Sequence, residues 1–200
     1  NFTFAHTVEI FRHAHFPFSR EARDLARKRL DFEQALLYLV AVEAHKADRQ
    51  RQNGVAFDVS GVLERFEKKL SFTLTNAQRR VIGEIAEDMQ RPVPMNRLLQ
   101  GDVGSGKTAV ALYALCVAAA NGRQGVLLAP TEILAEQHLL ELRGIFGDAA
   151  VLLTGSMKKR ARDEALMRIG DGTALCVVGT HALLSGGVRF HDLGCVVTDE

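Results

Sequence analysis

The 200-residue chain has few cysteines, no long apolar run and almost no net charge. Its three cysteines are too far apart for a disulfide framework or a paired-ligand metal site, which predicts reduced, buried thiols in a cytosolic protein. The longest apolar run, Ala109–Ala120, is shorter than the roughly 20 residues that span a bilayer. Residues 1–20 hold histidines, arginines and a proline, so we expect no signal peptide. The net charge of +1 gives no bulk attraction for a polyanion.

Glycine is scarce in the first part of the chain, where only Gly54 and Gly61 of the 17 glycines precede residue 70. Ser19 is a candidate N-cap before a charged stretch, and apolar residues then recur at spacings of three and four. This pattern predicts a helix from about residue 31 to about residue 52, ended by Asn53-Gly54. With a shorter helix expected over 61–70, residues 1–70 are predicted to form an all-helical connector.

From residue 71 onward, helical stretches alternate with short runs rich in Val and Leu. Runs that are apolar on both faces are typical of interior strands in a parallel sheet. Their alternation with helices predicts an α/β domain with a parallel sheet flanked by helices over 71–200. We expect strands at 97–100, 126–129, 150–153, 175–178 and 195–197, and helices at 107–120, 132–146 and 158–169.

The segment Gly101–Thr108 matches G-x-x-x-x-G-K-[ST] at every fixed position and is called here the phosphate-binding loop. Its glycines let backbone N–H groups wrap phosphates at the start of the following helix. Lys107 would place its ammonium between the β- and γ-phosphates, and the Thr108 hydroxyl would ligate Mg²⁺. The sequence therefore predicts a site for a nucleotide such as ATP with Mg²⁺. The expected contacts are Gly101, Gly104, Ser105, Gly106, Lys107 and Thr108.

Two carboxylates, Asp199 and Glu200, follow the expected strand at 195–197. Asp199 would hold the Mg²⁺ shell, and Glu200 would act as general base toward the attacking water. An Asp-Glu pair by itself could equally be a solvated turn, but the phosphate-binding loop upstream favours a catalytic role.

Further segments resemble motifs of superfamily 2 helicases. Phe72–Gln78 resembles the adenine-recognising motif, which implies that Gln78 reads the adenine edge and Phe72 stacks on the ring. The other resemblances are Ala129–His138 to motif Ia, Leu153–Ser156 to the Thr-Gly element, Gly179–Leu184 to motif Ib and Asp199-Glu200 to the first half of the DExH box.

The runs Pro94–Thr108, Ala129–His138 and Ala26–Gln34 resemble the RecG family of bacterial ATP-dependent DNA helicases, over about residues 20–200. This resemblance implies a RecA-like P-loop domain, the first motor domain, over 71–200, truncated within the DExH box of a longer protein. It also implies an enzyme that hydrolyses ATP with Mg²⁺ and remodels branched and duplex DNA at stalled forks and Holliday junctions, in recombination and repair. The implied state is a monomer in the bacterial cytoplasm, with no membrane partner.

The resemblance also implies which residues grip DNA phosphates: Pro130, Thr131, Thr154, Gly155, Thr180 and His181. Hydroxyl and N–H donors suit this role because they bind phosphate without reading sequence. Each threonine could instead cap a helix, as Thr131 would ahead of Glu132, and His181 could be structural. The basic cluster at 158–162 could flank DNA, although a solvated helix face is favoured. No metal site is expected at His6, His13 and His15.

Alternative functions remain open at this stage. A related superfamily 2 translocase, such as the transcription-repair coupling factor, would carry a similar phosphate-binding loop. A nucleotide-dependent switch or small-molecule kinase would not act on DNA, and motifs Ia and Ib argue against it. A scaffold with a vestigial site is disfavoured by the complete set Gly106, Lys107, Thr108, Asp199 and Glu200. We expect the isolated chain to bind ATP weakly, if at all, and to show negligible turnover.

Overall fold

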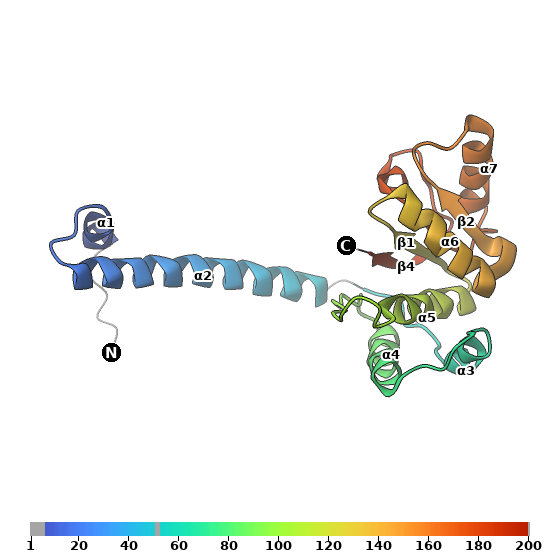
Figure 1. Ribbon diagram of the computed structural model, residues 1–200, viewed down its shortest axis with the longest axis horizontal. Helices are drawn as coiled ribbons and strands as arrows, with labels where there is room; N and C mark the ends of the chain where they lie inside the picture. The colour runs from blue at the N-terminus through green and yellow to red at the C-terminus, as the bar shows by residue number, and fades with distance from the viewer. Residues whose placement is uncertain (1–6, 51–52, 200) are drawn as a thin grey trace. The chain divides into compact units, whose positions relative to one another are not determined.

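The computed structural model describes residues 7–50 and 53–199, in two compact units divided after residue 52 (Figure 1). In the first unit, α1 (Thr7–His15) packs against α2 (Arg20–Gln50). The Ser19 hydroxyl accepts a hydrogen bond from the Ala22 amide at 3.1 Å, as expected of an N-cap. The long helix therefore starts at Arg20, and the prediction that it begins near residue 31 is wrong.

The charged stretch at 21–30 is helical because most of its residues are good helix formers. The Arg29 guanidinium lies 2.6 Å from the carboxylate of Glu33, one turn further on. Few apolar side chains of this unit are buried, Ile10 and Ala26 among them. Much of the apolar surface of α2 is exposed, at Leu25, Phe32, Leu36, Leu37, Tyr38, Leu39, Val40 and Val42.

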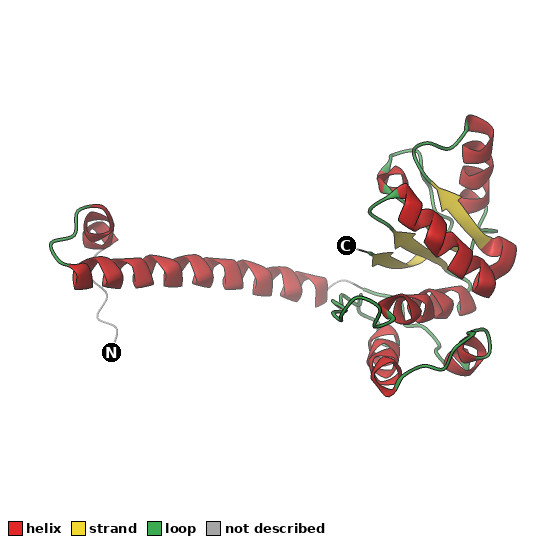
Figure 2. Ribbon diagram, in the orientation of Figure 1, coloured by secondary structure: helices red, strands yellow, loops and turns green. Residues whose placement is uncertain are grey.

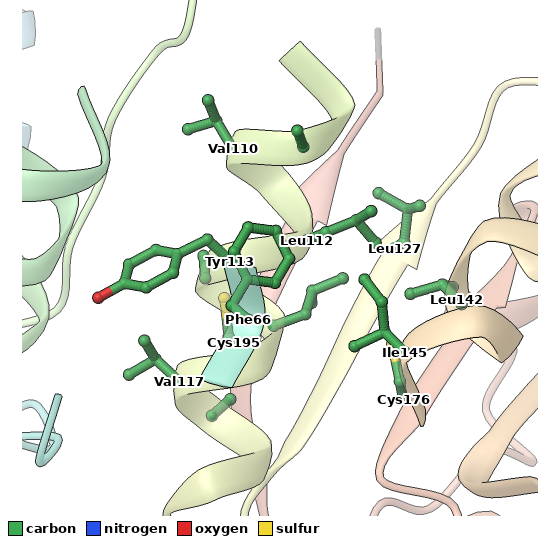
Figure 3. Close-up of a cluster of buried hydrophobic side chains, with 14 of the residues drawn as sticks. Phe66, Val110, Leu112, Tyr113, Val117, Leu127, Leu142, Ile145, Cys176 and Cys195 are labelled. Carbon is green, nitrogen blue, oxygen red and sulfur yellow. The ribbon is translucent and has the colours of Figure 1, made fainter. Parts of the chain in front are cut away.

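Residues 53–70, which the sequence analysis assigned to the connector, belong instead to the second unit. The short helix α3 (Val62–Glu67) buries Phe66 to 1% exposure in the core of that unit. The ring of Phe66 meets Tyr113 edge-on, with centroids 5.9 Å apart. Figure 3 shows these two side chains in one cluster with residues of the sheet and of the neighbouring helices.

The second unit is built on a parallel sheet with strand order β2-β3-β1-β4. Figure 2 shows the strands in yellow among the red helices of this unit. Its strands confirm four of the expected runs; β2 has the predicted bounds, and the ends of the other three are shifted by a residue or two. They are β1 (Gln124–Leu128), β2 (Ala150–Leu153), β3 (Cys176–Gly179) and β4 (Leu193–Thr198).

Helices cover both faces of this sheet, which confirms the predicted α/β class. On one face, Leu127 and Val178 pack in a core with side chains of α5 and α6; on the other, Val126 and Val177 pack with those of α7. The helices are α4 (Asn76–Met89), α5 (Lys107–Ala120), α6 (Glu132–Phe146) and α7 (Lys159–Gly170), with 3₁₀ turns at Gly147–Ala149 and His181–Leu184.

The expected strand at 97–100 is not a strand in the structure. Arg97 is held by two carboxylates of α4, with nitrogen–oxygen distances of 2.6 Å to both Glu84 and Asp88. The neighbouring Leu98 is 81% exposed. An interior strand of a parallel sheet is buried on both faces, and this segment lacks that burial. Among the residues that the structure describes, no helix combines the length and the apolar character needed to cross a membrane.

Candidate functional site

The predicted site residues gather where the strands end, called here the carboxyl edge of the sheet. Since the strands are parallel, the segments that follow them meet at this edge. Helix α5 packs on β1 and β4 and is joined by a short turn to the start of β1, so α5 runs back along the sheet. Its first residue, Lys107, therefore lies at the same edge as Asp199.

The phosphate-binding loop has the backbone conformation that its glycines predict. Gly104 and Gly106 have φ angles of 80° and 77°, in the left-handed region that favours glycine. A Cβ atom on Gly106 would also collide with the amide nitrogen of Gln78. Gly106 has no side chain with which to cap α5, so the first N–H groups of the helix remain available to an anion.

The Lys107 ammonium folds back onto this loop. Its Nζ donates to the carbonyl oxygens of Gly101 at 2.8 Å and Asp102 at 3.1 Å. These neutral acceptors are weaker partners than phosphate oxygens, so a bound phosphate would draw the ammonium away from them. Thr108 lies in the first turn of α5, half-buried beside Lys107.

Gln78 links the start of α4 to the phosphate-binding loop. It forms a capping box with Thr75, whose amide donates to Gln78 Oε1 at 2.9 Å and whose hydroxyl accepts from the Gln78 amide at 3.2 Å. The Gln78 side-chain nitrogen donates to the Ser105 carbonyl at 3.0 Å. Phe72 is 52% exposed. The reading of adenine by Gln78 and Phe72 stays a prediction.

Asp199 follows β4 and is held through both its backbone and its side chain. Its amide donates to the Leu128 carbonyl at 2.8 Å, extending the pairing of β4 with β1. Its Oδ2 lies 2.8 Å from Nε2 of His138, a residue of α6 that is 8% exposed. The sequence analysis gave His138 no role, although a histidine among apolar residues of a buried helix face was a usable signal. Glu200 lies outside the described residues.

Glu132 is a second residue that the sequence analysis passed over. Its carboxylate accepts from the Ser156 amide at 3.0 Å and from the Ser156 hydroxyl. These bonds lower the pKa of the Glu132 carboxyl because they favour its charged form. The contact joins the start of α6 to the Thr-Gly element.

The predicted DNA contacts differ in exposure. Thr131 is exposed and caps α6, accepting from the Leu134 amide at 3.3 Å, so the capping alternative is confirmed for this residue. Pro130 and Gly155 are also exposed. Thr154 is only 3% exposed, which turns its side chain away from solvent.

The remaining DNA candidates follow β3. Thr180 is half-buried, and His181 is exposed at the start of the 3₁₀ turn. Most of the basic cluster at 158–162 is exposed, but Arg162 reaches back to the Thr154 carbonyl at 3.4 Å. The exposed lysines and Arg160 agree with the favoured solvated helix face, and Arg162 is the member of the cluster that bonds back to the fold.

The donor chemistry of this edge suits Mg²⁺. Mg²⁺ prefers oxygen ligands and is usually held by one or two carboxylates together with substrate phosphates. The Thr108 hydroxyl and the Asp199 carboxylate match that description. Among the described residues, no three His, Cys, Asp or Glu side chains form a metal-binding cluster, and a site completed by a nucleotide requires none.

Comparison with known proteins identifies the family to which this chain belongs. A family model for the DEAD/DEAH box helicase matches residues 75–200. The chain belongs to the DEAD/DEAH box helicase family. Its parallel sheet flanked by helices is the RecA-like helicase fold that was predicted.

The helicase chain is similar to two proteins described as ATP-dependent DNA helicase RecG. It is 50% identical to the one from Bacillus subtilis (strain 168), over 93% of the chain and 28% of that protein. It is 44% identical to the one from Synechocystis sp., over 93% of the chain and 23% of that protein. The chain thus spans about a quarter of the length of these relatives.

A solved structure agrees with the sequence relatives. The structure of RecG bound to a three-way DNA junction superposes with a TM-score of 0.78 at 37% identity. The match covers 96% of this helicase chain and 27% of the RecG chain.

Proposed function

We propose that this chain is the nucleotide-binding part of an ATP-dependent DNA helicase that remodels branched DNA, such as stalled forks and Holliday junctions, in recombination and repair. The observation that carries the proposal is the meeting of the phosphate-binding loop and Asp199 at one edge of the sheet. Similarity to RecG proteins, one of them bound to a three-way junction, supports the choice of DNA as the partner. Residues 7–50 would form the connector and residues 53–199 the first motor domain.

In the proposed mechanism, the chain binds ATP and stabilises the charge that develops on the γ-phosphoryl group. The N–H groups at the start of α5 and the Lys107 ammonium hold the β- and γ-phosphates. Gln78 and Phe72 hold the adenine. Thr108 and Asp199 hold Mg²⁺, which neutralises phosphate charge when bound. Glu200 takes the proton of the attacking water.

The same edge of the sheet would carry the tracked DNA strand. Phosphates would bind N–H and hydroxyl donors of the segments after β1, β2 and β3, with Thr131, Gly155, Thr180 and His181 as the donors. Such contacts ignore base identity, as a translocating motor requires. Pro130, which has no N–H, and Thr154, whose side chain is buried, would shape these segments rather than donate to phosphate. We propose that the whole protein works as a monomer in the bacterial cytoplasm.

The test uses the full-length protein and a three-way DNA junction. We expect the junction to stimulate ATP hydrolysis, and we expect Lys107→Ala to abolish hydrolysis while leaving junction binding intact. Lys68→Ala, which removes an exposed lysine at the end of α3, is the matched control and should behave as wild type. Normal turnover in Lys107→Ala would overturn the assignment of the phosphate-binding loop. Hydrolysis that no DNA stimulates would favour a nucleotide-dependent switch.

A further inference from the structure

The contact between His138 and Asp199 joins α6 to the end of β4. Nε2 of His138 lies 2.8 Å from Oδ2 of Asp199, and the two side chains are 11% and 43% exposed. The backbone of Asp199 is already held by its bond to Leu128 on β1. The strand fixes the backbone of Asp199 but not its side chain. The contact with His138 therefore fixes the side-chain rotamer of the carboxylate.

The state of the imidazole follows from its partner. An ionised carboxylate can only accept hydrogen bonds, so Nε2 of His138 carries the proton in this contact. The other ring nitrogen, Nδ1, is buried and has no hydrogen-bond partner among the residues that the structure describes. Burying a polar atom without a partner costs free energy. Packing alone would favour an apolar side chain here, which indicates that the bond to Asp199 is what the histidine provides.

The contact leaves Asp199 able to bind a further ligand. The bond from His138 uses one lone pair of Oδ2, and an ionised carboxylate has about four lone pairs on its two oxygens. The remaining lone pairs can bind a metal ion. Groups that orient a metal-binding carboxylate tune its affinity for the ion without touching the ion themselves.

We propose that His138 is a positioning residue that orients the Asp199 carboxylate toward the Mg²⁺ of a bound nucleotide. The inference rests on the proposed function, because it assumes that Asp199 serves the nucleotide site. His138 acts through Asp199 and touches neither the nucleotide nor the ion. Its removal therefore weakens the effect of Mg²⁺ on nucleotide binding and leaves binding without Mg²⁺ unchanged.

The experiment measures the affinity of the full-length protein for a fluorescent ADP analogue, once with Mg²⁺ and once with EDTA. In His138→Leu, the enhancement of affinity by Mg²⁺ is expected to fall roughly tenfold or more. The affinity in EDTA is expected to match wild type. His138→Gln should retain most of the enhancement, because its amide N–H can take the place of Nε2–H.

A double-variant cycle separates positioning from a merely structural role. If His138 acts through Asp199, then His138→Leu with Asp199→Asn binds the Mg²⁺ nucleotide as weakly as Asp199→Asn alone. Glu141→Gln, an exposed change on the same helix, is the matched control and should equal wild type. If His138→Leu does not fold, His138→Asn replaces it, because the shorter amide cannot reach Asp199.

The outcomes that overturn the inference are specific. The inference is refuted if His138→Leu keeps the full enhancement by Mg²⁺, or if it loses affinity equally in Mg²⁺ and in EDTA. It is also refuted if the double variant binds the Mg²⁺ nucleotide more weakly than Asp199→Asn alone. Lys107→Ala tests the underlying proposal in the same assay. Unchanged nucleotide affinity in Lys107→Ala would refute the assignment of the nucleotide site itself. Lower affinity in Lys107→Ala together with wild-type behaviour in His138→Leu would refute only the role of His138.

Discussion

The side chain of Gln124, at the start of β1, is predicted to be a major source of stability in the second unit. It is 1% exposed. Its Nε2 donates to the carbonyls of Ile169 at 2.9 Å and Ala174 at 2.8 Å. Its Oε1 accepts from the amides of His191 at 2.7 Å and Asp192 at 3.1 Å. One amide thus ties together the end of α7, the approach to β3 and the approach to β4.

The perturbation is Gln124→Met, which fills a similar volume but forms none of these bonds. Each buried hydrogen bond contributes about 0.5–1.5 kcal/mol net, so the four together predict a loss of roughly 2–6 kcal/mol. That is a large share of the roughly 5–15 kcal/mol by which a domain is stable. A loss of 2 kcal/mol corresponds to a roughly 30-fold larger unfolded fraction.

Thiol labelling in urea reads out this loss. All three cysteines lie in the second unit, so labelling reports on that unit alone. Burial raises the pKa of Cys116 to about 12 and that of Cys195 to about 11. The folded protein therefore presents little reactive thiolate near pH 8, and labelling requires unfolding. We expect Gln124→Met to be labelled at a clearly lower urea concentration than wild type.

The neighbouring Arg123 supplies the control. Arg123→Met breaks the 2.7 Å ion pair with Asp192, whose two side chains are 27% and 44% exposed. Such a pair is worth less than about 1 kcal/mol because water and salt screen it. A Gln124→Met variant that loses no more stability than Arg123→Met would refute the reasoning.

Other predictions concern the site. Gly106→Ala should lower ATP affinity roughly 5- to 30-fold in a calorimetric titration, because an L side chain at φ 77° costs roughly 1–2 kcal/mol in the loop conformation that binds phosphate. Gly83→Ala, inside α4 with open space around its Cβ, should leave affinity unchanged; equal losses in both variants would contradict this geometry. The hydrogen bonds from Ser156 lower the pKa of the Glu132 carboxyl below 4.5 in the folded protein. The ionised carboxylate therefore stabilises the contact fully above pH 4.5, and this stabilisation is lost as the pH falls through the lowered pKa of the folded state. Hydrogen exchange of the Ser156 amide, corrected for its intrinsic rate, should lose protection over that range, and in Glu132→Gln the pH dependence should disappear.

The two helices predicted to the residue have local start signals. Helix α5 begins at Lys107 because Gly106 has a positive φ that no helix contains, and α6 begins after the Thr131 cap. The false strand at 97–100 has a strand-like local pattern. In the structure Arg97 of this segment pairs with two carboxylates of α4, a tertiary contact that no local pattern reveals.

The residues of the candidate site also separate into those that a local motif indicates and those that only a tertiary contact reveals. Lys107, Thr108 and Asp199 could be proposed from the sequence because each belongs to a short motif whose spacing is set by the chemistry of phosphate and metal binding; their roles stay predictions. His138 was missed because its partner lies on a different element, far along the chain. The core position of Phe66 was missed for the same reason, since its partner Tyr113 belongs to α5. Pairings of this kind depend on tertiary structure and leave little trace in sequence periodicity.

The bonds of Gln78 constrain how nucleotide specificity can be engineered. One amide caps α4, braces the phosphate-binding loop through the Ser105 carbonyl and is the predicted reader of adenine. A substitution of Gln78 that relaxes the choice of base would also remove a brace from the phosphate-binding loop. Variants that accept other nucleotides should therefore be sought at positions around the proposed base site, with Gln78 retained.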